Sequence, residues 1–152
     1  RELATTMDLL PTFCSLTGAP LPPKKLDGFD ISGMLFGHEG VQSQYEALYY
    51  YRRRQLQAIR FGDWKYHLPL KATHPNWTSA NQTGPGRPGK LVNLTSDLQE
   101  KTDVTAANPD VIQRIGELIQ NAERTLGNDD KPGSEQRDAR TLESSKPMTL
   151  KK

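Results

Sequence analysis

The sequence predicts an α+β fold, a small antiparallel sheet of about four strands packed against a C-terminal helix. Residues 47–68 and 90–94 form β-prone segments that turn residues separate. Residues 111–126 carry apolar side chains at helical spacing. A long apolar stripe on a helix needs a partner surface, and the sheet would supply it.

The N-terminal residues predict a short helix and an extended linker. Asp8 can cap the helix and Gly18 can end it. We expect the buried face of this helix to consist of Leu9, Leu10, Phe13 and Leu16. Three prolines in residues 19–25 favour an extended linker, and a second helical turn is expected between Asp30 and Gly37.

The four predicted strands are residues 47–51, 55–61, 64–68 and 90–94. Gly62 and Asp63 supply the turn between the second and third strands. Ala58 and Ile59 are both apolar, which interrupts strict alternation in the second strand. This pattern fits either a β-bulge or a strand that is covered on both faces.

The remaining segments are a long loop, a helix and a tail. Residues 74–89 are rich in proline and glycine, and we expect them to form a loop. Asn108 and Pro109 are a cap and a first-turn proline for the C-terminal helix, which Gly127 ends. The polar residues after it predict a disordered tail. The expected division is therefore 1–40 as the end of one domain with its linker, 41–127 as a subdomain, and 128–152 as the tail.

Composition limits the partners of the chain. The net charge is +2 with acidic and basic residues intermixed, so the sequence does not predict a nucleic-acid partner. No apolar run approaches the roughly 20 residues of a membrane span, and no membrane partner is expected.

Three motifs in order carry a family resemblance. Residues 8–30 contain Asp-Leu-Leu-Pro-Thr and then Asp-Gly-Phe-Asp, and residues 58–66 read Ala-Ile-Arg-Phe-Gly-Asp-Trp-Lys-Tyr. Residues 91–104 read Leu-Val-Asn-Leu-Thr-Ser-Asp-Leu-Gln-Glu-Lys-Thr-Asp-Val. Together they resemble the C-terminal portion of the sulfatase family, of the arylsulfatase A type. The resemblance implies the C-terminal subdomain of an alkaline-phosphatase-like sulfatase, and it implies that the chain is a fragment of a longer enzyme.

The resemblance also indicates where the chemistry resides. Enzymes of this family hydrolyse sulfate esters with a formylglycine made from the first residue of Cys-x-Pro-x-Arg, and with calcium or magnesium. Cys14 is followed by Ser-Leu-Thr-Gly, so we interpret it as a small buried helix residue. Asp27 and Asp30 are interpreted as turn and cap residues. We therefore expect no catalytic residue, no metal ligand and no cofactor in this chain.

One histidine is a candidate for substrate binding. His67 lies near the end of the third predicted strand, and His74 lies in the loop that follows. In the resembling enzymes a histidine of this loop lies near the mouth of the substrate pocket, which makes His74 the candidate contact. A surface-loop histidine is the alternative.

The resemblance further implies partners and a compartment. The expected partners are a sulfatase catalytic domain in the same parent chain and a sulfated small molecule or glycan. A periplasmic, secreted or lysosomal location is expected. Asn76, Asn81 and Asn93 begin N-glycosylation patterns.

Two other functions fit the sequence. A related C-terminal domain could belong to a phosphodiester or phosphonate ester hydrolase. The aromatic and arginine residues of 45–54 would also suit a stand-alone binding module.

Overall fold

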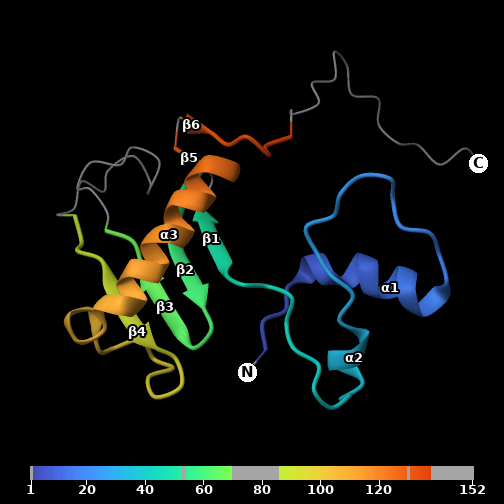
Figure 1. Cartoon of the computed structure of the whole chain (residues 1–152), viewed down its shortest axis with the longest axis horizontal. Helices are drawn as coiled ribbons and strands as arrows, with labels where there is room; N and C mark the ends of the chain where they lie inside the picture. Colours follow the sequence, from blue (N-terminus) through green and yellow to red (C-terminus); the bar gives the residue numbers. More distant parts are fainter. Residues whose placement is uncertain (1, 53, 70–85, 130, 138–152) are drawn as a thin grey trace, which may run out of the picture.

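The computed structural model describes residues 2–52, 54–69, 86–129 and 131–137. Four strands form one antiparallel sheet in the order β1-β2-β3-β4: Leu48–Arg52, Gln55–Phe61, Trp64–His67 and Lys90–Asn93. Helix α3, Pro109–Thr125, lies across one face of this sheet (Figure 1). The part of the chain that holds α1 lies beyond the edge strand β1, on the side away from β2 (Figure 1). The predicted α+β class is confirmed.

The second strand, β2, has both a β-bulge and two covered faces, the two alternatives that its sequence left open. The pairing with β1 shifts between Tyr50 and Tyr51, because Tyr50 faces Ala58 while Tyr51 faces Leu56. This shift is a β-bulge. Ala58 and Ile59 are also both buried, so β2 is covered on its two faces. The predicted turn after β2 is present, with Gly62 at a φ of 54°.

The core lies between α3 and the sheet. Ile115, Leu118 and Ala122 are the buried residues of α3, as the helical stripe predicts. Leu118 and Ala122 share a cluster with Leu56 and Ile59 of β2. The helix therefore owes its position to burial of one apolar face.

Both ends of α3 differ from the prediction of a cap at Asn108 and a disordered tail after Gly127. Asn108 occupies the cap position, but its side chain donates to the Val104 carbonyl and caps no amide of the helix. Beyond the helix, β5 (Gly127–Asn128) and β6 (Lys131–Pro132) pair as a small hairpin. The first residues of the segment predicted as a disordered tail thus form regular structure. Residues 138–152 lie outside the described part.

The N-terminal part begins with a 3-10 turn, η1 (Thr6–Asp8), followed by α1 (Leu9–Thr17) and, after the linker, α2 (Ser32–Leu35). Gly18 ends α1 in the left-handed conformation, as predicted. The expected capping role of Asp8 is wrong for α1. Thr5 is the cap of this N-terminal turn, and its Oγ1 accepts from the Met7 amide at 3.1 Å.

The apolar face of α1 is not buried in this chain, contrary to the sequence-based expectation. Its members are 43–57% exposed: Leu9, Leu10, Phe13 and Leu16. The buried residues of α1 are Pro11, Thr12 and Cys14, which belong to the other side of the helix. Helical spacing identifies an apolar face but does not say what covers it. Nothing among the described residues covers this one.

A second short helix, η2 (Thr105–Ala107), connects β4 to α3. None of the helices in the described ranges is long and apolar enough to cross a membrane.

Candidate functional site

Two polar centres organise the described part of the chain, and the first is built on Asp8. Its side chain is fully buried. The carboxylate accepts from the Thr5 amide at 2.6 Å, the Phe29 amide at 2.8 Å and the Tyr45 hydroxyl at 2.5 Å. Burial raises the pKa of Asp8, but the hydrogen bonds from Tyr45, Phe29 and Thr5 outweigh it and hold the pKa below its ordinary value.

This first centre explains the spacing of the first motif. Thr12 is buried, donates to the Asp8 carbonyl at 2.7 Å and accepts from the Ile31 amide at 3.0 Å. A Cβ at Gly28 would lie 2.1 Å from the Met7 carbonyl oxygen, so only glycine lets the linker approach η1 so closely. The Asp-Leu-Leu-Pro-Thr and Asp-Gly-Phe-Asp segments are therefore one structural unit that joins η1, α1 and the linker.

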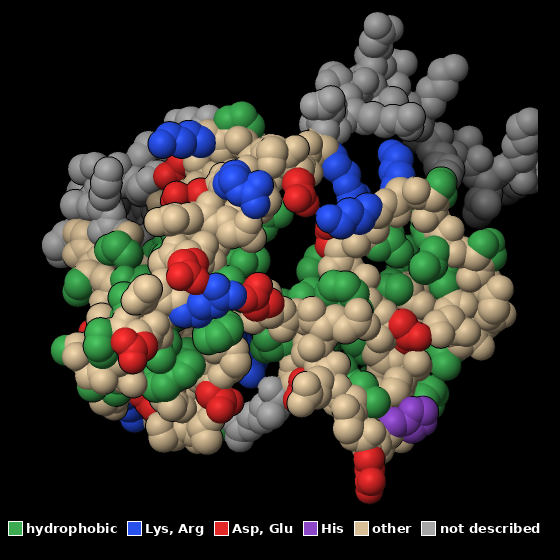
Figure 2. Space-filling model, viewed as in Figure 1, with side chains coloured by type: hydrophobic (Ala, Val, Ile, Leu, Met, Phe, Trp, Pro, Cys, Tyr) green, Lys and Arg blue, Asp and Glu red, His purple; other side chains and the backbone are tan. Residues whose placement is uncertain are grey.

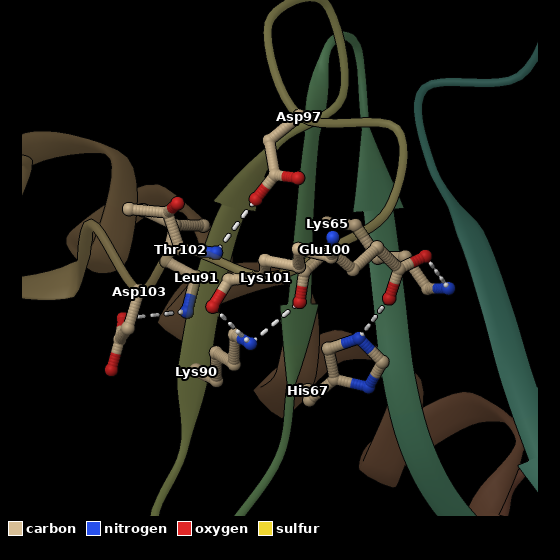
Figure 3. Close-up of polar contacts among 9 residues, drawn as sticks. All are labelled: Lys65, His67, Lys90, Leu91, Asp97, Glu100, Lys101, Thr102 and Asp103. Atoms are coloured by element: carbon tan, nitrogen blue, oxygen red, sulfur yellow. Dashed lines mark hydrogen bonds and ion pairs between the residues drawn. The ribbon is translucent and has the colours of Figure 1, made fainter.

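The second centre lies on β3 and on the loop after β4 (Figure 3). The Glu100 carboxylate accepts from the Lys65 Nζ through Oε1 and lies against the His67 Nε2 through Oε2, both at 2.6 Å. Lys65 and His67 are two positions apart on β3, so their side chains leave the same face of the sheet. All three side chains are between 19% and 28% exposed.

The loop that carries Glu100 is anchored through hydrogen bonds to its backbone. The Lys90 Nζ donates to the carbonyls of Glu100 and Lys101 at 2.6 and 3.1 Å. Asp97 accepts from the Thr102 amide at 2.7 Å and closes the loop. Glu100 itself has a φ of 54°, a conformation that costs a non-glycine residue energy and persists where its surroundings enforce it.

The charges of this second centre compensate each other. Burial raises the pKa of Glu100, but the hydrogen bonds from Lys65 and His67 outweigh it and hold the pKa below its ordinary value. Glu100 is therefore ionised near neutral pH, and each of its carboxylate oxygens already has a hydrogen-bond partner. Such a carboxylate orients its partners and is poorly placed to act as a base.

The structure tests the predicted site residues to different extents. His74, the predicted substrate contact, lies outside the described residues, and so do Asn76 and Asn81. Cys14 is buried and its thiol faces the Pro20 carbonyl at 3.8 Å. Asp30 accepts from the Ser32 amide at 2.8 Å.

The structure also bears on metal binding and on residues that were not predicted as site residues. Within the described ranges, no three His, Cys, Asp or Glu side chains come together as a metal site. The ion pair between Lys65 and Glu100 joins the second sequence motif to the third. The role of His67 was missed, and the only available signal was its spacing of two from Lys65 on one strand.

Several large apolar side chains are exposed at the surface of the N-terminal part. Figure 2 shows hydrophobic side chains at the surface of the part that holds α1 and the linker. Besides the face of α1, the exposed large apolar residues of this part include Leu21, Leu35 and Phe36, at 57%, 59% and 64%. Patches of this kind mark interaction surfaces.

Comparison with known proteins assigns the chain to a family. The family model described as the C-terminal region of aryl-sulfatase matches residues 43–145. The chain therefore belongs to this family. The resemblance to the C-terminal portion of sulfatases, which the sequence motifs indicated, is confirmed.

Individual relatives agree with the family. Human arylsulfatase A is 33% identical over 134 residues, which cover 78% of this chain and 26% of that protein. The N-acetylgalactosamine-6-O-sulfatase of Bacteroides thetaiotaomicron is 25% identical over 121 residues, which cover 79% of this chain and 23% of that protein.

A solved structure from work on glycosaminoglycan metabolism by Bacteroides thetaiotaomicron superposes with a TM-score of 0.56 at 25% identity. The match covers 76% of this chain and 24% of that one. The chain thus spans about a quarter of the length of these relatives.

Proposed function

We propose that this chain serves as the C-terminal part of a sulfatase that hydrolyses sulfate esters, and that it covers the catalytic domain of the same parent chain. The exposed apolar face of α1 carries this proposal. Phe13 and Leu16, at 57% and 50% exposure, project from a helix whose other side is fixed by Thr12 and Asp8. A face that is rigidly held yet uncovered suits a permanent partner.

The catalytic chemistry would come from that partner. Cys14 is buried within its helix, and the described residues do not form a carboxylate cluster suited to calcium or magnesium. The residues present here therefore do not fit the formylglycine or the metal ion that the family uses. In the proposed enzyme both belong to the catalytic domain. Exposure of the α1 face, measured in the chain alone and in the longer enzyme, tests the covering role.

We further propose that the segment between β3 and β4 contributes to the rim of the substrate pocket, with His74 as a contact. Two observations support this role. Both flanking strands are anchored through Glu100 and Lys90, so the ends of the segment are fixed. The relatives include an enzyme named for a sulfated amino sugar, whose organic part is larger than the sulfate itself.

Replacing His74 with alanine in the longer enzyme is expected to lower kcat/KM for a bulky sulfated sugar more than for a small aryl sulfate. The reason is that a rim residue contacts the organic group and leaves the sulfate-binding machinery intact. Steady-state kinetics with both substrates measures the difference. Equal changes in kcat/KM for the two substrates would show that His74 is a surface-loop histidine and does not contact the organic group.

A further inference from the structure

Residues 131–137, hereafter the strap, connect the end of α3 to the linker of the N-terminal part. Figure 1 shows them leaving β6 and continuing toward the part that holds α1. Three interactions join the strap to the linker. The Arg137 guanidinium donates to the Lys25 carbonyl at 2.7 Å and lies 3.4 Å from the Asp27 carboxylate. The Glu135 carboxylate pairs with the Lys25 Nζ at 3.5 Å.

The other end of the strap is held by the C-terminal end of α3. The last carbonyls of a helix have no partner within the helix. Here the Ser134 amide donates to the Arg124 carbonyl at 2.9 Å, and the Glu135 amide donates to the Thr125 carbonyl at 2.8 Å. A Cβ at Gly133 would lie 2.2 Å from the Thr125 carbonyl oxygen, so the strap packs closely against the helix end.

The strap borders a groove between the two parts of the molecule. This groove has a volume of about 840 Å³. It is lined by residues 47–51 in and before β1, by Leu26 and Phe29 after the linker, and by Glu135 and Arg137 of the strap. Figure 2 shows the molecule hollowed between the two parts, with Lys and Arg side chains gathered along one border of the hollow. The position of the strap therefore determines how far the linker stands from β1.

The two ends of the strap are held with different strengths. Backbone hydrogen bonds and close packing hold it to α3, whereas charged side chains that are 55–83% exposed hold it to the linker. Exposed ion pairs stabilise a contact only weakly, and salt screens them. The contact with the linker is therefore expected to open first, while the contact with α3 persists.

We propose that residues 131–137 are a salt-sensitive strap, which holds the linker toward the sheet and α3 at low ionic strength and releases it at high ionic strength. In the closed state the N-terminal part keeps one orientation relative to β1. Release lets this part move about the connection before β1, and the groove widens. The strap lies wholly within this chain and operates whatever activity the longer enzyme has.

The distance between spin labels in the two parts measures this closure in the 152-residue chain. Thr17→Cys on α1 and Gln120→Cys on α3 place the labels at exposed positions, and Cys14→Ala removes the native thiol. Double electron–electron resonance gives the distance distribution. We expect it to be about twice as wide at about 1 M salt as at about 0.01 M, because the Debye length falls from about 30 Å to about 3 Å.

Arg137→Gln is expected to give the wide distribution already at low salt, because it removes the guanidinium that reaches the linker. Arg124→Gln is the matched control. It removes the same charge near the same end of α3, but its guanidinium bonds to Asn121 within the helix, and the distribution is expected to stay narrow. Lys25→Glu is expected to widen the distribution, and adding Glu135→Lys is expected to narrow it again by restoring the ion pair in reverse.

The variants separate the strap from other charge effects. Salt also weakens the ion pair between Arg114 and Glu46, which joins α3 to the residue before Ala47, so the salt series is read together with the variants. Equal widths for Arg137→Gln and Arg124→Gln at low salt would overturn the strap, and so would a wide distribution in the wild type. A width that does not change with salt would overturn its salt sensitivity. A double variant as wide as Lys25→Glu alone would overturn the role of the Lys25–Glu135 pair.

Discussion

Asp8→Ala is expected to lower the free energy of unfolding by about 3–5 kcal/mol, because it leaves buried or partly buried donors without an acceptor. These donors are the amides of Thr5 and Phe29 and the hydroxyl of Tyr45. Urea unfolding of the 152-residue chain, followed by circular dichroism, measures the change. Asp30→Ala is the control, since its carboxylate lies at the surface of the same linker and is expected to cost much less.

The same carboxylate contributes to acid sensitivity. Because the folded state lowers the pKa of Asp8, its contribution to stability is present above the ordinary aspartate pKa of about 4 and is lost as the pH falls through the folded value. Asp8→Asn is therefore expected to lose less stability than the wild type as the pH falls below about 4. An Asp8→Ala variant as stable as Asp30→Ala would contradict the structural role of this centre.

Ile115→Asp is the second substitution with a large expected effect. Ile115 is 1% exposed between α3 and the rest of the fold, and an aspartate there would be a buried charge without a partner. We expect a loss of about 3–5 kcal/mol or failure to fold. Thermal unfolding measures it, and Ile115→Val, with an expected loss of about 1 kcal/mol, gives a graded comparison.

Gln113→Asp supplies the matched control for this substitution. It places the same side chain on the same helix, at an exposed position. Its melting temperature is expected to stay close to that of the wild type. If Ile115→Asp and Gln113→Asp melt alike, α3 does not pack as described.

Much of the sheet and α3 could be predicted from the sequence because both depend on local patterns. The periodicity of Ile115, Leu118 and Ala122 identifies the buried face of the helix, and Gly62 identifies the turn. The two interpretations of Ala58 and Ile59 were both right, since a bulge and two covered faces coexist there. Local pattern was sufficient where the partner surface lies within the same chain.

The features that escaped prediction depend on distant contacts. Asp8 resembled a helix cap in sequence, but its partners Phe29 and Tyr45 are 21 and 37 residues away. His67 and Glu100 are separated by 33 residues and meet only through the loop after β4. The predicted burial of Phe13 failed for a related reason, since the sequence shows the apolar face of α1 but not the surface that would cover it.

The most direct test of the central claim is the exposure of the α1 face in two settings. Hydroxyl-radical footprinting with mass spectrometry reports the exposure of Met7, Phe13 and Leu16, which are 48%, 57% and 50% exposed in this chain. Leu98, 64% exposed in the loop after β4, is the internal control. We expect Phe13 and Leu16 of the α1 face, and Met7 of the neighbouring η1, to be modified readily in the chain alone and protected in the longer enzyme, with Leu98 modified in both. Equal modification of Phe13 in the two settings would contradict the proposal that this region covers a sulfatase catalytic domain.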